Sequence, residues 1–455
     1  MSEQGFHPLT LAPTSSRTPP AQPSKVRSRQ TKRIQASNRV GPLDRMFRRG
    51  VLRSLSGIRR GRLTVIEGGK RHDFGDPSPT AQPSAVVTVH DPACWKRVAL
   101  GGTIGAGEAY MAGEFSCSDL TAMTRLFVVN RNVMNGMEGR LAWLGRAGHW
   151  LAHLGNGHSR AGDRRNIAAH YDLGNDFFER FLDRDAMMYS AGIFPRAESS
   201  LEEASLAKLD AVCRKLELSP RDHVLEIGTG WGGFACHAAR RYGCRVTTTT
   251  ISRRQYEHAK ARVAREGLQG RVEVLLKDYR DLEGVYDKLV SIEMIEAVGH
   301  RHLGTFFRRC DALLKPGGAM LLQAITIAEP FHEQARRSVD FIQRYIFPGG
   351  SLPSVRVLCE AMGGHSALQP RNLEDIGLHY ATTLRHWRER FLPHRDALRA
   401  EGYTPSFLRM WEFYLAYCEG GFLERALGTV QMLLVKDGPW GEPARDSEHG
   451  QEGRS

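Results

Sequence analysis

The stretch VLEIGTGWGGFA, from Val224 to Ala235, decides the fold of this chain. Its apolar start is typical of a strand, and Gly228, Gly230 and Gly233 then fit the pattern G-x-G-x-x-G. Such a loop joins a strand to a helix and lets a ligand approach the backbone closely. Taken alone, the loop leaves open whether that ligand is a dinucleotide or a molecule without phosphate.

The sequence after the loop alternates between strands and helices. We expect strands at HVLEI, CRVTTTTI, VEVLLKD, YDKLVSIEM and GAMLLQAITI, with the last of these closing the series. Alternation of this kind predicts an α/β fold with a parallel, doubly wound sheet. Ahead of it, RLTVIEGG, SAVVTVHD and CWKRVALGG predict strands and turns, and SDLTAMTRLFVVNRN predicts a helix capped by Ser118 or Asp119. These elements together predict a small N-terminal α+β domain.

Composition divides the chain into five segments. We expect a disordered basic tail at 1–40, the small domain at 41–136, a linker at 137–165, the large domain at 166–437 and a disordered tail at 438–455.

Positive charge gathers at the N-terminal end. The net charge is +13, and residues 1–60 hold 13 lysines and arginines against two acids. Between Leu43 and Ile58, apolar residues recur at helical spacing with arginines among them, which predicts a basic amphipathic helix. Its apolar face either lies in an anionic headgroup layer or packs on its own domain.

The remaining composition favours the cytoplasm. The apolar runs are too short to cross a bilayer, and the N-terminal residues lack the apolar region of a secretory signal. The eight cysteines form no C-x-x-C pair, so we expect neither disulfides nor a metal site.

The acids near the loop separate the two kinds of ligand. A dinucleotide site needs a carboxylate about 20 residues past the loop, but Val246–Ser252 has none. Glu226, just before the loop, is placed to meet a cationic amino group, while Asp278 and Tyr279 are placed to bind and stack an adenine. These features fit S-adenosylmethionine. A structural salt bridge for Glu226 and a cap role for Asp278 remain open.

A longer series of motifs supports this interpretation. With them in order, the chain resembles the cyclopropane-fatty-acyl-phospholipid synthase family from about Arg59 to Met432. The motifs are HYDLGNDFFERFL (170–182), MMYSAGIF (187–194), LEIGTGWGGFA (225–235), TISRRQ (250–255), KDYRDL (277–282), SIEMIEAVGH (291–300), DFIQRYIFPGG (340–350), SLPSV (351–355), HYATTLRHW (379–387) and YCEGGF (417–422).

The resemblance implies a class I methyltransferase, Rossmann-like fold whose N-terminal domain helps to dock lipid. It implies methyl transfer from S-adenosylmethionine to a cis double bond of a phospholipid acyl chain, which forms a cyclopropane ring. Thr250 and Gln255 would take the role that an acid plays toward the ribose in dehydrogenases. The cofactor-binding residues would be Tyr189, Ser190, Glu226, Gly228, Gly230, Gly232, Thr250, Gln255, Asp278, Tyr279 and Arg280.

Family members use a bound bicarbonate as the base that removes a proton after methyl transfer. The matching positions here are Ala191, Glu296, Gln323, Ile325 and Tyr380, and the family has a cysteine and a histidine where Ala191 and Gln323 stand. A cyclopropane is the favoured product, with a methylene- or methyl-branched chain as the alternative and a catalytically weak lipid-binding protein as the second. Cys418 matches a cysteine that family descriptions single out, although the mechanism gives a thiol no obvious task.

The implied partners are an anionic phospholipid surface and an unsaturated acyl chain. We expect a cytoplasmic protein that associates peripherally with the inner membrane and binds no nucleic acid. A homodimer remains open.

Overall fold

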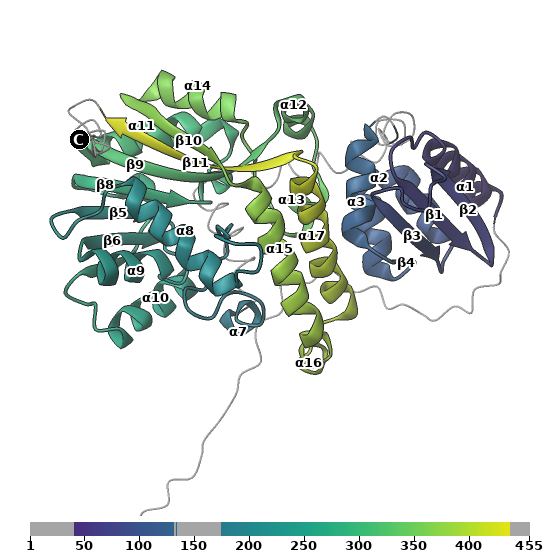
Figure 1. Cartoon of the computed structure of the whole chain (residues 1–455), viewed down its shortest axis with the longest axis horizontal. Helices are drawn as coiled ribbons and strands as arrows, with labels where there is room; N and C mark the ends of the chain where they lie inside the picture. The colour runs from purple at the N-terminus through teal and green to yellow at the C-terminus, as the bar shows by residue number, and fades with distance from the viewer. Residues whose placement is uncertain (1–40, 132, 134–173, 437–455) are drawn as a thin grey trace, which may run out of the picture.

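The computed structural model describes residues 41–131, 133 and 174–436, which form two sheets (Figure 1). The N-terminal sheet has the strand order β2-β1-β3-β4, and the large sheet has the order β10-β11-β9-β8-β5-β6-β7. The predicted tails at 1–40 and 438–455 and the predicted linker at 137–165 lie outside the described residues.

The small domain confirms most of its predicted elements. It contains α1 (Pro42–Leu55), β1 (Arg62–Glu67), β2 (Lys70–Gly75), β3 (Ser84–Val89), α2 (Ala93–Ala112), β4 (Phe115–Cys117) and α3 (Leu120–Val129). Asp119 caps α3, since its side chain accepts a hydrogen bond from the backbone of Ala122. The prediction of strand and turn for CWKRVALGG is wrong, because this segment lies in α2. Its N-cap is Pro92, which forms no side-chain cap, and its paired glycines Gly101 and Gly102 hid the helical pattern in the sequence.

The predicted amphipathic helix forms as α1. Phe47, Val51 and Leu55 are buried within their own domain, where α1 packs on α2. Leu43 and Met46 remain 65% and 49% exposed. The helix therefore divides its apolar residues between the domain core and the surface.

The large sheet contains the five predicted strands, which pair in parallel. They are β5 (His223–Ile227), β6 (Arg245–Thr250), β7 (Val272–Leu276), β8 (Tyr286–Ile292) and β9 (Leu314–Ile327). The prediction that β9 closes the series is wrong, because β10 (Leu368–Asp375) and β11 (Leu427–Lys436) extend the sheet in antiparallel fashion. Most of β10 is polar and exposed, so it lacks the alternation that marks a strand in sequence.

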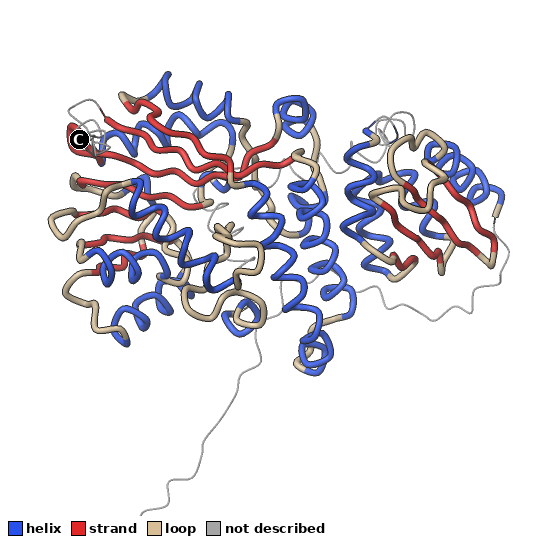
Figure 2. The backbone as a smooth tube through the Cα atoms, viewed as in Figure 1, coloured by secondary structure: helices blue, strands red, loops and turns tan. Residues whose placement is uncertain are grey.

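Helices cover both faces of the large sheet (Figure 2). One face packs on α8 (Leu201–Lys215), α9 (Gly233–Tyr242) and α10 (Arg253–Arg265), and the other on α11 (Leu303–Leu313) and α14 (Val355–His365). Short helices and turns complete the described chain: α7 (Asn175–Phe178), η1 (Tyr279–Asp281), η2 (Ile295–Ala297), η3 (His300–His302), α12 (Glu329–Arg337), α13 (Phe341–Tyr345), η4 (Leu392–His394) and α16 (Arg395–Ala400).

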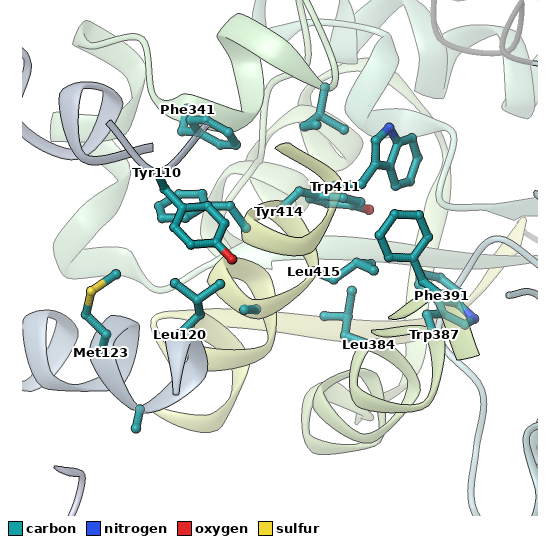
Figure 3. Packing of buried hydrophobic residues seen from close by; sticks show 14 of the residues in the cluster. Tyr110, Leu120, Met123, Phe341, Leu384, Trp387, Phe391, Trp411, Tyr414 and Leu415 are labelled. Carbon is teal, nitrogen blue, oxygen red and sulfur yellow. The ribbon is translucent and has the colours of Figure 1, made fainter. Parts of the chain in front are cut away.

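Two long helices, α15 (Gly377–Phe391) and α17 (Pro405–Leu423), lie between the large sheet and the N-terminal domain (Figure 1). One hydrophobic cluster runs from Leu120 and Met123 of α3 to Trp387 of α15 (Figure 3). At Gly107 of α2, an added Cβ would lie 2.3 Å from the ring of Phe341, so only glycine allows this approach. The small domain thus braces the helices that carry part of the candidate site.

Candidate active site

The glycine loop follows β5 at the carboxyl edge of the sheet. Gly228 has φ +107° and Gly230 has φ +53°, which are backbone conformations that favour glycine. The N–H groups of Gly228 and Thr229 both donate to the carbonyl of Thr249 at 3.0 Å, which ties the loop to β6. At Gly233, an added Cβ would lie 2.4 Å from the carbonyl oxygen of Ala186, so this glycine serves packing. Gly232, at the N-cap of α9, completes the loop.

Glu226 lies beneath the loop with 3% exposure. Its carboxylate accepts a hydrogen bond from the Thr248 hydroxyl at 2.7 Å, and burial raises its pKa to about 8. The loss of hydration on burial explains the direction, because it disfavours the charged carboxylate. Among the described residues, Glu226 takes part in no ion pair, so the structural salt bridge that was left open for it is not formed. Its predicted role toward the amino group of the cofactor stays a prediction.

Lys208 of α8 is a residue that the sequence analysis missed. It is fully buried, and its ammonium group donates to the Ser190 hydroxyl at 2.9 Å. Burial lowers its pKa to about 8, while the charges of Glu293, Asp183 and Glu226 oppose that shift. Its position on the apolar stripe of α8 was a usable signal, because a lysine is seldom fully buried unless it is paired.

Thr250 and Gln255 meet at the end of β6. The Thr250 hydroxyl donates to Gln255 Oε1 at 2.9 Å, and both side chains are buried. Ser252 caps α10 and so holds Gln255 in place. The pair offers neutral hydrogen-bonding groups at the position where a dehydrogenase has an acid.

Asp278 begins the turn η1 after β7. Its carboxylate accepts from the Arg280 side chain at 2.9 and 2.7 Å and caps η1 through the Arg280 N–H. The cap role that was left open for Asp278 is therefore present. Tyr279 lies with its ring 5.6 Å from that of Phe306.

An aromatic wall flanks the crevice. The Tyr189 hydroxyl lies 3.0 Å from the Tyr414 hydroxyl, and the Tyr189 ring lies 5.1 Å from Trp387 and 5.3 Å from Phe178. Buried Asp183 positions the segment before Tyr189, because it accepts from the N–H groups of three residues, Ala186, Met187 and Met188. Such a wall excludes water and presents ring faces to a developing positive charge.

Two carboxyl groups follow β8, with Glu293 directly after the strand and Glu296 in the turn η2. Glu296 Oε1 accepts from the Ile325 N–H at 2.5 Å, and its buried Oε2 has no hydrogen-bond partner among the described residues. Burial, reinforced by the charge of Glu293, raises the pKa of Glu296 to about 8. Glu293 accepts from the Ala191 N–H at 2.9 Å and from Gln323 Nε2 at 2.8 Å, and it is hydrogen-bonded to Tyr380. Burial raises its pKa as well.

Glu293 was not predicted as a site residue, although it lies in the motif SIEMIEAVGH. Its carboxylate takes hydrogen bonds from the Ala191 N–H, Gln323 and Tyr380, which are three of the positions that the resemblance assigned to the bicarbonate site. The Ile325 N–H is already bound to Glu296. The residues present therefore do not fit a second, free carboxylate-like anion.

Cys418 of α17 is partly buried near Tyr380 and Tyr414. Burial raises the pKa of its thiol, and the charge of Asp340 adds to the shift. The thiol is therefore held in its protonated form, which is a poor nucleophile.

A separate cleft of about 230 Å³ lies among β9, α15 and α17, and its lining includes Ile327, Leu378 and Phe422. None of the predicted cofactor-binding residues lines it. In the described part of the chain, no helix is long and apolar enough to span a membrane, and no group of three or more His, Cys, Asp and Glu side chains is placed to hold a metal ion.

Comparison with known proteins identifies the family. The model of the mycolic acid cyclopropane synthetase family matches residues 158–432, which is more than half of the chain. The chain belongs to this family. The crevice fits S-adenosylmethionine, because it offers a buried carboxylate and a Thr–Gln pair where the amino group and the ribose would bind.

Individual relatives support this family assignment. The chain is 41% identical to tuberculostearic acid methyltransferase UfaA1 of Mycobacterium tuberculosis over 80% of this chain and 87% of the relative. It is 38% identical to the cyclopropane-fatty-acyl-phospholipid synthase of Escherichia coli over 77% of this chain and 88% of that protein. The crystal structure of mycolic acid cyclopropane synthase CmaA1 complexed with SAH and CTAB matches with TM-score 0.57 and 32% identity, covering 60% of this chain and 98% of that one.

Membership in the mycolic acid cyclopropane synthetase family confirms the class I methyltransferase fold and the predicted enzyme class. The protein is an S-adenosylmethionine-dependent methyltransferase that modifies fatty acyl groups.

Proposed function

We propose that this methyltransferase acts on the cis double bond of an unsaturated acyl chain carried by a phospholipid. The observation that carries the proposal is the placement of an aromatic wall and a carboxyl pair beside the cofactor crevice. S-adenosylmethionine supplies an electrophilic methyl group on a sulfonium. An alkene has no proton to lose before it reacts, so the protein must align it and keep water away.

The residues of the site divide into three roles. Glu226, Thr250 and Gln255 hold the cofactor through its amino group and ribose, with the glycine loop allowing close approach of its methionyl part. Tyr189 and Tyr414, joined at 3.0 Å, face the positive charge that develops on the acyl chain. The carboxyl pair of Glu293 and Glu296 serves the loss of a proton that ends the reaction.

We favour a methylene-branched product over the ring that the sequence favoured. Two donors of the family's anion pocket are replaced, by Ala191 and Gln323, and Glu293 fills the space between them. In addition, the 41% identical relative is named for a methyl-branched acid. The cyclopropane remains a second candidate, since Glu296 and Tyr380 are retained and the Escherichia coli relative is named for that product.

Peripheral docking to an anionic membrane is part of the proposal. Exposed Leu43 and Met46 on α1 lie among exposed Arg45, Arg49 and Arg53. Apolar side chains beside arginines suit a surface helix that contacts anionic headgroups.

The test uses labelled S-adenosylmethionine and vesicles of dioleoyl phosphatidylglycerol. We expect label in the acyl chains, less label with neutral dioleoyl phosphatidylcholine, and none with fully saturated chains. Mild hydrogenation separates the products, because a methylene branch takes up hydrogen and a cyclopropane resists. Binding of S-adenosylmethionine without any labelled lipid would reject the substrate class.

A further inference from the structure

Glu293 occupies a backbone position that suits glycine. Its φ is +49°, and its N–H donates to the Gln323 carbonyl at 2.8 Å directly after β8. A residue with a Cβ is disfavoured in this left-handed region, and such positions cluster at functional sites. The backbone therefore gives no reason for a glutamate here, and the reason must lie in its side chain.

The side chain is held by several elements. Glu293 Oε1 accepts from the Ala191 N–H at 2.9 Å and from Gln323 Nε2 at 2.8 Å. The orientation of the Gln323 amide is set from behind, because its Oε1 accepts from Gln431 Nε2 at 2.9 Å. Gln431 Oε1 in turn accepts from Lys215 at 2.6 Å. This series of hydrogen bonds directs the N–H donor of Gln323 at Glu293 and stabilises the ionised form of its carboxylate.

We infer that the Glu293 carboxylate is the base of this enzyme and takes the place of a free anion. The inference rests on the proposed function and deepens it. The carboxylate accepts hydrogen bonds from Ala191, Gln323 and Tyr380, and it is attached to the protein through the Glu293 side chain. A covalently attached base is present at every turnover, so the enzyme needs no bicarbonate.

The charges around Glu293 suit this role. Buried Lys208 faces it from α8, Glu296 from η2 and the Tyr380 hydroxyl from α15. Lys208 favours the ionised form of Glu293, while Glu296 sits close enough for its own ionisation to be opposed. Part of each glutamate stays accessible, as a group that meets substrate requires.

The proton balance is simple. When the π pair of the alkene has bonded to the incoming methyl group, a carbocation remains on the acyl chain. A hydride shift moves the positive charge to the methylated carbon, and a C–H bond of the new methyl then breaks. Its electron pair forms the C=C bond of the methylene branch, and the proton passes to the Glu293 carboxylate and then to solvent. Without the hydride shift, the same pair would close a ring.

The experiment compares Glu293→Gly with the wild-type enzyme in bicarbonate-free buffer. We expect the wild type to run at the same rate with and without added bicarbonate. Glu293→Gly suits the backbone and removes the carboxylate, so it should bind S-adenosylmethionine normally but form the methylated product at least about 100-fold more slowly, because the proton is not removed after methyl transfer. Added bicarbonate or formate should restore part of its rate. Glu293→Gln should be slow and beyond rescue, because its amide still fills the pocket.

Glu217→Gly is the matched control, since Glu217 is an exposed residue with φ +52° between α8 and β5. It should keep wild-type activity. A wild-type requirement for bicarbonate, or a Glu293→Gly enzyme as fast as wild type, would overturn the inference.

Direct binding separates this inference from the proposed function. With carbon-13 bicarbonate followed by NMR, we expect binding to Glu293→Gly and none to the wild type. Bicarbonate binding to the wild type would overturn the inference whatever the substrate proves to be. Absence of lipid methylation by the wild type would instead reject the proposed function.

Discussion

The proposed cofactor crevice and the carboxylate pocket around Glu293 both form at the carboxyl edge of the parallel strands but are built differently. Short stretches of sequence make the crevice, with Gly228 and Gly230 in one loop and Thr250 and Gln255 five residues apart. The pocket is assembled from Ala191, Glu293, Gln323 and Tyr380, which come from distant parts of the chain. The crevice depends on the backbone conformation at Gly228 and Gly230, whereas the pocket depends on the identity of its side chains, so a single substitution there alters its chemistry.

Lys208 connects the two regions. Its ammonium group faces Glu226 of the crevice and Glu293 of the pocket, and it also hydrogen-bonds Ser190. A substitution of Lys208 should therefore affect both regions, whereas a substitution confined to one region should leave the other unchanged.

The largest effect is expected for Lys208→Met, which leaves buried carboxylates without their cation. Removing one partner from a buried ionic group costs about 3–5 kcal/mol, so we expect the free energy of unfolding to fall by that amount. Urea denaturation measures it. Lys315→Met is the control, because Lys315 is 46% exposed beside Asp287 and should change stability by less than about 1 kcal/mol. Equal effects in the two variants would contradict a joint role of Lys208.

A smaller effect, limited to the crevice, is expected for Gly228→Ala. Its φ of +107° is strained for alanine, so the loop must shift. We expect the affinity for S-adenosylmethionine to fall at least tenfold, about 1.4 kcal/mol, in calorimetry. Gly267→Ala shares a positive φ, +68°, in open space after α10 and should bind normally. A changed ratio of ring to methylene product in Gly228→Ala would show that the two regions are not separable.

The smallest effect concerns pH and the pocket alone. The folded state keeps the proton of Glu296 up to about pH 8, while the unfolded chain releases it near the ordinary value of 4.5. Stability from this group is thus full below pH 4.5 and is lost as pH rises toward 8. The free energy of unfolding should therefore decline between pH 6 and 7, and Glu296→Gln should remove up to about 1.4 kcal/mol of that decline.

Urea denaturation across this pH range measures the slope. Glu226, whose pKa is also about 8, keeps its own share of the decline in the variant. A Glu296→Gln slope identical to that of the wild type would contradict the raised pKa.

Local patterns made parts of the structure predictable. The strands β5 to β9 and the cap at Asp119 follow from residues close in sequence. The helix α2 and the strand β10 were missed because their local patterns are weak and packing decides them.

The sequence by itself determined the family, through its series of motifs, and the parallel strands of the doubly wound sheet, because motifs and strand periodicity depend on residues a few positions apart. Only the tertiary structure decided that Glu293 accepts from Gln323, that buried Lys208 interacts with the charges of Glu293, Asp183 and Glu226, and that part of α1 faces its own domain. These outcomes depend on contacts between residues as much as 102 positions apart, as for Ala191 and Glu293. No local pattern encodes them, since each depends on which side chains folding brings within hydrogen-bonding distance.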